Sequence, residues 1–142
     1  MNTRRVVTAF LSHGGKVLIL KRAPGMPTYP GKWGGVSGAI EKGDASAEAC
    51  VRREIEEELR IADAGRVLVG EPFELDAPEM DVRWIVHPAL VETPARELRL
   101  SRDHTEARWI APEAICEYDT VPRLEESLAR ALAAGRATRG RG

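Results

Sequence analysis

Three glutamates at helical spacing are the residues of this 142-residue chain whose types and positions most suggest chemistry. Glu54, Glu57 and Glu58 stand at positions i, i+3 and i+4. Because each helical residue advances by about 100°, their carboxylates share an arc of about 100° on one helix face. Carboxylates gathered on one face without basic partners form a site for a hard divalent cation such as Mg²⁺ or Mn²⁺. The alternative is a solvated acidic face with no ligand.

A glycine-rich segment leads directly into this helix and favours the metal site over the solvated face. Residues 33–43 read Trp-Gly-Gly-Val-Ser-Gly-Ala-Ile-Glu-Lys-Gly. Backbone carbonyls exposed in such a loop can complete a metal shell, and the N–H groups at a helix start favour anions. The two features together predict a site for a cation and an anionic substrate.

The helix that carries the glutamates is predicted over residues 46–59. Ser46 is a suitable N-cap residue, and Val51, Ile55 and Leu59 form an apolar stripe that faces the core. The acidic arc borders this stripe, so we expect Glu58 to be only partly solvated.

The remaining elements predict an α/β layered domain with a mixed β-sheet. Strands are expected at residues 6–11, 17–20, 33–36, 67–69, 82–91 and 108–110, and further helices at 112–118 and 121–134, the last ending at Gly135. His13-Gly14-Gly15-Lys16 reads as a hairpin turn, and Pro88 places its strand near an edge or a bulge.

Charge and composition exclude several classes of function. The chain has 21 Lys+Arg and 22 Asp+Glu, a balance that argues against a nucleic-acid binder. Its longest aliphatic run, residues 17–20, is far too short to span a membrane. Cys50 and Cys116 lack paired spacing, so we expect neither zinc nor a disulfide and a cytoplasmic location. We expect a monomer or homodimer that acts on a small molecule.

The C-terminal residues differ in composition from the rest of the chain. Residues 135–142 contain three arginines and no acidic residue. This composition predicts a basic, disordered tail after a single domain of residues 1–134.

The segment from Gly38 to Ile61 resembles a Nudix box, the signature of the Nudix hydrolases. The pattern is G-x5-E-x7-R-E-U-x-E-E-x-G-U, where U is bulky and aliphatic. Arg53-Glu54-Ile55 and Glu57-Glu58 match its central run, and with the flanking elements the resemblance covers most of residues 4 to 134. It implies a Nudix α/β/α sandwich with a mixed sheet. The implied activity is divalent-metal-dependent hydrolysis of a nucleoside diphosphate linked to another group.

The resemblance also implies roles for individual residues. Glu54 is a metal ligand or the base that activates water, and Arg53 holds a glutamate in position. Arg22 contacts a substrate phosphate, and Trp33 stacks on a base unless it belongs to the core. The implied metal ligands are Gly38, Glu54, Glu57, Glu58 and Asp103. Glu106 is the alternative to Asp103 as the carboxylate from outside the box.

The sequence departs from the family pattern in three places. Asp44 stands where the pattern has Glu, one extra residue separates it from Arg53, and Arg60 replaces the glycine after the helix. The extra residue falls before Ser46 and leaves the glutamate spacing intact, but it puts the role of Asp44 in doubt. We expect Arg60 to let the helix continue or to end it under strain.

The sequence is also compatible with other functions on the same fold. The chain could bind a nucleotide metabolite or a partner protein without turnover, although both paired glutamates are present. An isoprenoid diphosphate isomerase is disfavoured because neither cysteine lies on a strand near the box. Among substrates, a nucleoside triphosphate or similar small nucleotide is the first hypothesis.

Overall fold

Strand β1 (Asn2–His13) forms the longest pairing of the fold, because it lies parallel to β7 (Val82–Glu92) along nearly its whole length. It turns directly into β2 (Lys16–Arg22) through Gly14 and Gly15. Their φ angles of 58° and 78° are those of a tight hairpin turn, so the predicted turn is confirmed. This computed structural model describes residues 1–94 and 97–139.

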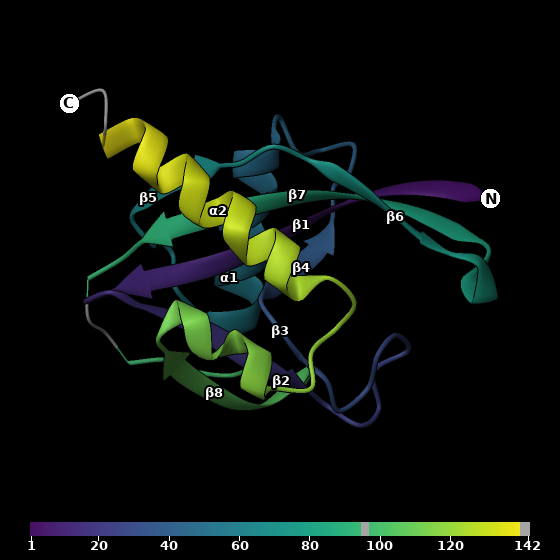
Figure 1. Ribbon diagram of the computed structural model, residues 1–142, viewed down its shortest axis with the longest axis horizontal. Helices are drawn as coiled ribbons and strands as arrows, with labels where there is room; N and C mark the ends of the chain where they lie inside the picture. Colours follow the sequence, from purple (N-terminus) through teal and green to yellow (C-terminus); the bar gives the residue numbers. More distant parts are fainter. Residues whose placement is uncertain (95–96, 140–142) are drawn as a thin grey trace.

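Helices cover both faces of one mixed sheet, which confirms the predicted α/β/α sandwich (Figure 1). Besides β1, β2 and β7, the strands are β3 (Trp33–Gly34), β4 (Val36–Ala39), β5 (Arg66–Val69), β6 (Phe73–Ala77) and β8 (His104–Ile110). The sheet order is β3-β2-β1-β7-β5, with β4 beside β1, β6 beside β7 and β8 beside β2. The helices are α1 (Ala47–Leu59) and α2 (Leu124–Arg139), with 3₁₀ segments η1 (Pro78–Met80) and η2 (Pro112–Glu117).

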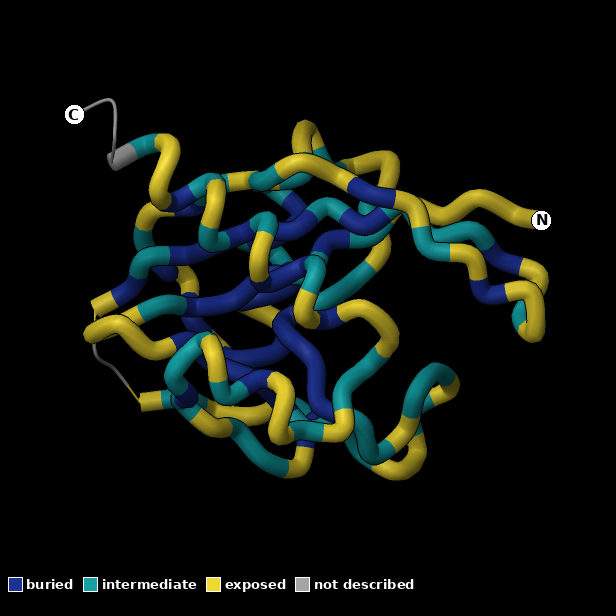
Figure 2. The backbone as a smooth tube through the Cα atoms, in the orientation of Figure 1, coloured by how far each residue is buried: buried dark blue, intermediate teal, exposed yellow. Residues whose placement is uncertain are grey.

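Each face of the sheet has its own apolar core. On one face, Val51, Ile55 and Leu59 of α1 are buried where the helix packs on β4, β1 and β5, so the predicted stripe is confirmed. On the other face, Leu124 and Leu128 of α2 pack in a second cluster with η2. Buried residues fill the centre of the fold, whereas residues 1–5 and the turn between β6 and β7 are largely exposed (Figure 2). No helix in the described ranges is long and apolar enough to cross a bilayer.

Pro88 lies in a central strand, so the predicted edge or bulge is wrong. β7 pairs with β1 on one side and with β5 and β6 on the other. Pro88 occupies the interval between the β6 and β5 pairings, where its oxygen accepts a 2.8 Å bond from Gly70 N–H. Since N–H and C=O of one residue point to the same side of a strand, the missing N–H faces this interval and costs the sheet no ladder bond.

Helix α2 continues through Arg139, so the helix end predicted at Gly135 is wrong. Gly135 is buried, and the Thr138 hydroxyl donates to the Ala134 carbonyl at 3.2 Å. Packing of the helix face outweighs the low helix propensity of glycine. Residues 135–139 of the predicted tail are therefore helical, and residues 140–142 lie outside the described residues.

Candidate active site

Helix α1 is fixed at both ends, and this sets the direction of its glutamates. Ser46 is the N-cap, as predicted, and its Oγ accepts from Ala49 N–H at 3.1 Å. Arg60 ends the helix in the left-handed conformation with φ of 59°, and its N–H donates to the Glu56 carbonyl. The helix therefore stops without the usual glycine, at the cost of backbone strain at Arg60.

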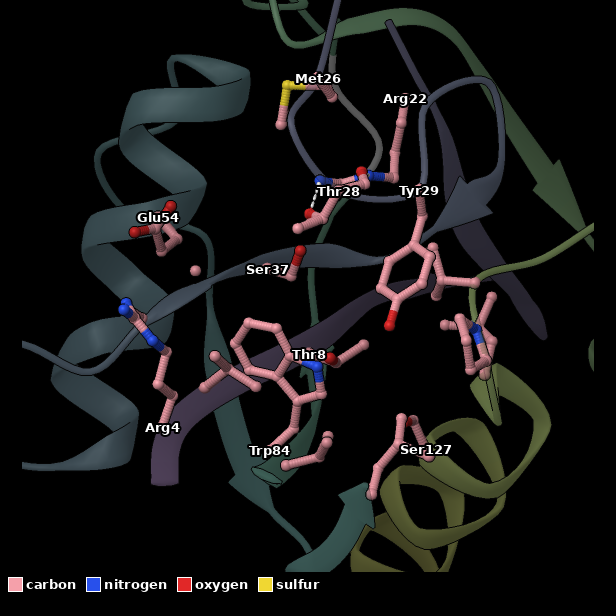
Figure 3. A pocket seen from close by; sticks show the side chains of 18 of the residues that line it. Arg4, Thr8, Arg22, Met26, Thr28, Tyr29, Ser37, Glu54, Trp84 and Ser127 are labelled. Carbon is pink, nitrogen blue, oxygen red and sulfur yellow. Dashed lines mark hydrogen bonds between the residues drawn. The ribbon is translucent and has the colours of Figure 1, made fainter. Parts of the chain in front are cut away.

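Glu54 and Glu58 lie one turn apart on α1 and line the same cavity. Figure 3 shows Glu54 reaching into this cavity from the helix. Glu58 is 6% exposed, and its Oε2 has no hydrogen-bond partner in the described part of the chain. Burial, followed by repulsion from Glu54, raises the pKa of Glu58 to about 10. Burial also raises the pKa of Glu54. Two desolvated carboxyl groups thus share one pocket.

Gly38 of β4 lies directly against the Glu54 carboxyl group. A Cβ at this position would overlap the carboxyl carbon and oxygens of Glu54. Glycine is therefore required here by close approach and not by an unusual φ angle. The Gly38 backbone borders the same cavity as Glu54 and Glu58.

Arg53 links the segment before α1 to the glutamates of the helix. Its Nε and Nη2 donate to the two carboxylate oxygens of Asp44 at 3.0 and 2.9 Å. Nη1 donates to Glu54 Oε1 at 2.8 Å, and Nη2 also donates to the Ala39 carbonyl. Arg53 lowers the pKa of Asp44 to about 2. Asp44, whose role the inserted residue left in doubt, thus anchors the arginine that orients Glu54.

Glu57 lies apart from the other two glutamates. Its side chain is 58% exposed, and its carboxylate is 3.5 Å from Arg53 Nη1. It lies with Glu56 and Arg60 on the exposed side of the helix. Within residues 1–94 and 97–139, no group of three or more His, Cys, Asp or Glu side chains has metal-binding geometry. The structure therefore brings Glu54 and Glu58 together, whereas the Glu57 side chain points toward Arg53.

The two candidate outer carboxylates occupy different surroundings. Asp103 lines the cavity, and its charge contributes to the raised pKa of Glu58. Glu106 lies on β8 among exposed cations, 3.6 Å from Lys21 Nζ and 3.6 Å from Arg108 Nη2. Only Asp103 of this pair faces the cavity.

Two further groups close to the carboxyls are uncharged. His104 Nε2 lies 3.4 Å from Glu58 Oε1 without hydrogen-bond geometry. Burial, followed by the charge of Arg22, lowers the pKa of His104 to about 4, so the imidazole is neutral at pH 7. Cys50 is buried beneath β4, and burial raises the pKa of its thiol to about 12. Cys50 packs in the apolar core between α1 and the sheet.

Arg22 stands at the end of β2 on the rim of the cavity. Its Nε and Nη2 donate to the backbone oxygen and the hydroxyl of Thr28, both at 2.9 Å. Burial lowers the pKa of Arg22, yet a guanidinium keeps its charge at neutral pH. Arg22 thus holds the β2–β3 loop while presenting a cation to the cavity.

Trp33 is a core residue and does not line the cavity. It is 7% exposed, packs edge-on against Tyr118 at 5.3 Å between ring centroids, and lies under the Arg108 guanidinium. The cavity takes its aromatic walls from Tyr29 and Trp84 instead. Its volume is about 340 Å³, within the range of small-molecule pockets. Other lining residues not singled out from the sequence are Arg4, Thr8, Thr28, Ser37 and Ser127.

A model of the NUDIX domain matches residues 1–133. The chain belongs to the Nudix hydrolase family. The resemblance noted in the sequence is therefore confirmed, and the chain is a Nudix-type pyrophosphohydrolase.

Relatives of this Nudix hydrolase agree with that assignment. The nucleoside triphosphatase NudI of Escherichia coli O17:K52:H18 is 26% identical over 131 residues, which cover 84% of this chain and 89% of NudI. The MutT NUDIX hydrolase of Burkholderia pseudomallei superposes with a TM-score of 0.75 at 23% identity, covering 92% of this chain and 98% of its own. The NUDIX domain of Shewanella oneidensis NrtR, complexed with ADP ribose, gives 0.75 at 16% identity, covering 94% and 88%. The two structures show a shared fold.

Proposed function

We propose that this Nudix hydrolase cleaves the pyrophosphate linkage of a nucleoside triphosphate or similar small nucleotide, and that the reaction requires Mg²⁺ or Mn²⁺. One observation carries the proposal. A pair of buried carboxyl groups, Glu54 and Glu58, lines a pocket that also contains two aromatic rings, Tyr29 and Trp84. With a divalent cation held by the carboxyl groups, that arrangement would suit a ligand with a phosphate end and a planar end.

The donor set fits a divalent cation. The buried Oε2 of Glu58 has no hydrogen-bond partner within the described residues. Carboxylate oxygens are the ligands that hard cations prefer, and this one is not engaged by another group of the protein. Glu54, the Gly38 carbonyl and Asp103 border the same cavity. Glu57 completes the proposed set by turning from Arg53, since its side chain is exposed and free to change rotamer. A bound divalent cation neutralises phosphate charge and acidifies water.

Residues of the chain provide the rest of the chemistry. Arg53 holds the Glu54 carboxyl in place through the 2.8 Å hydrogen bond. Burial raises the pKa of Glu54 above its ordinary value, which makes its carboxylate a stronger acceptor for a proton from water. The Arg22 guanidinium faces the cavity and can pair with a substrate phosphate.

The choice of substrate rests on two supports. NudI, which is similar over most of both chains, is named a nucleoside triphosphatase. The cavity of about 340 Å³ is at the small end of the usual range, which favours one nucleoside over two.

The experiment is a panel of nucleoside triphosphates, ADP-ribose and a diadenosine polyphosphate, assayed with Mg²⁺, with Mn²⁺ and with excess chelator. We expect turnover of a triphosphate only when metal is present. Glu58→Gln should lower kcat/KM by about a hundredfold or more. Mutation of a residue that only hydrogen-bonds to a metal ligand already lowers metal affinity or activity by about 10–100-fold. Glu56→Gln is the matched control, because Glu56 is exposed on the far side of α1. Full turnover in chelator would refute the metal requirement.

A further inference from the structure

Strand β8 lies at an edge of the sheet, and its outer side has no partner strand in residues 1–94 and 97–139. Its inner side pairs with β2 over most of its length. In the same part of the chain, residues 105–110 make no backbone hydrogen bond outside the pairing with β2. Figure 1 shows β8 along the lower border of the molecule. A row of free N–H and C=O groups of this kind is a template for pairing with another strand.

The direction of the backbone groups on β8 follows from the bonds of β2. Arg22 N–H donates to the Lys32 carbonyl, and the Arg22 carbonyl accepts from Gly31 N–H, so the Arg22 backbone points away from β8. The register shift between Lys21 and Arg22 adds a residue on β8 and leaves the alternation of β2 unchanged. Because backbone groups alternate in direction along a strand, those of Ile19 and Lys21 point toward β8.

On β8, the free backbone groups belong to Ala107 and Trp109. Glu106 and Arg108 lie opposite Lys21 and Ile19, so their N–H and C=O groups bond to β2. Ala107 and Trp109 alternate with these residues, so their N–H and C=O groups point outward. The register is regular from position 106 to position 110, which gives a short, uninterrupted edge.

The side chains on either side of Ala107 carry opposite charges. Glu106 and Arg108 are two residues apart and lie on the same face of the sheet, with 44% and 53% of their side chains exposed. When two copies of β8 are paired antiparallel about a twofold axis at Ala107, Glu106 of each copy is directly opposite Arg108 of the other. Opposite charges in opposed positions stabilise paired strands, and like charges destabilise them. The charges on this edge therefore match their own copies.

We propose that, independently of the proposed nucleotide hydrolysis, β8 pairs with β8 of a second copy of this chain to form a homodimer with one continuous sheet. The pairing is antiparallel and centred on Ala107. The two Ala107 residues exchange two N–H···O=C hydrogen bonds across the axis, because both backbone groups of this residue point outward. The two Glu106–Arg108 pairs fix the register, and the twofold axis makes one surface complementary to itself.

Sedimentation equilibrium of the full chain tests for the dimer. One ladder between short strands is a small interface, so the protein concentration is varied from about 10 μM to about 1 mM. We expect the weight-average mass to rise from that of the monomer toward twice that value. A monomer mass over the whole range overturns the proposal.

Charge variants test the register. Glu106→Arg and Arg108→Glu each place like charges opposite one another, so each should raise the dimer dissociation constant about tenfold or more. The double variant that carries both changes restores opposite charges and should dimerise like the wild type. An equimolar mixture of the two single variants should also dimerise, because each charge then meets its opposite. A loss that neither the double variant nor the mixture reverses overturns the register.

A proline variant tests the hydrogen bonds of the edge. Ala107→Pro removes an outward N–H and no bond to β2, a position at which an edge strand tolerates proline. It should remain a monomer at every concentration, with an unfolding midpoint close to that of the wild type. Ala107→Ser keeps the N–H and is the matched control, which should dimerise. Dimerisation of the proline variant like the wild type overturns the proposal; if this variant does not fold by circular dichroism, the charge variants decide.

Discussion

Glu58→Gln should make the metal-free protein more stable at neutral pH. In the folded chain the pKa of Glu58 is raised to about 10, first by burial and then by Glu54. In the unfolded chain the carboxyl has its ordinary pKa of 4.5. The folded state therefore retains a proton that the unfolded state releases above pH 4.5. Stability contributed by this group is fully present below pH 4.5 and falls as pH rises toward 10.

The size of the effect follows from that difference. One pH unit corresponds to about 1.4 kcal/mol for a single proton. Neutral pH lies two and a half units above the unfolded pKa, so retaining the proton costs folding about 3 kcal/mol at pH 7. Glutamine is neutral at every pH and avoids this cost. The gain from Glu58→Gln should thus be about 3 kcal/mol at pH 7 and below about 1 kcal/mol at pH 5.

Urea unfolding in excess chelator at the two pH values measures this difference. Glu57→Gln is the control on the same helix, because its side chain is 58% exposed and its loss should change stability little. Added Mg²⁺ should stabilise the wild type and should stabilise Glu58→Gln less, since a ligand that binds the folded state raises its stability. An equal gain at pH 5 and pH 7, or the same gain from Glu57→Gln, would refute the reasoning.

Three further predictions concern the walls of the site and the C-terminal helix. Gly38→Ala should abolish most of the turnover with little loss of secondary structure by circular dichroism, because the new Cβ displaces the adjacent Glu54 carboxylate. Asp103→Asn should lower turnover, with part of the loss recovered at higher Mg²⁺, whereas Glu106→Gln should leave the magnesium titration unchanged; the reverse result would assign the role to Glu106. A chain ending at Ala134 should unfold about 3 °C or more below the full chain by calorimetry, because buried Gly135 and the last helical turn are removed. An unchanged midpoint would show that this turn adds no stability.

Local signals in the sequence were enough to predict helix α1. Its N-cap at Ser46 and its apolar stripe depend only on residues within the helix, and the structure confirms both. The glutamates follow from the same geometry, although Glu57 turns away because Arg53 lies within reach of its exposed side chain. Helical spacing determines on which face of the helix a residue lies, but not with which charged neighbour its side chain forms an ion pair.

Features that depend on distant segments were not predictable in this way. Trp33 and Trp84 both lie on strands, and only the register of those strands decides which ring meets the cavity. Tyr29 lies in a loop rich in proline and glycine, where its unusual φ is imposed by the fold. Pro88 is tolerated in a central strand because two different strands end on either side of it, and no local pattern encodes that gap.

The parallel pairing of β1 with β7 has a consequence for how the chain reaches its native state. Asn2 lies beside Val82 and Ser12 beside Glu92, so the central ladder joins segments about 80 residues apart. Contacts this distant along the chain slow folding, typically to milliseconds or longer, because loop closure must precede the stabilising interactions. During synthesis, β1 is made long before β7 and can pair early only with β2 and β4. Its other edge remains open to pairing with other chains until Glu92 has left the ribosome.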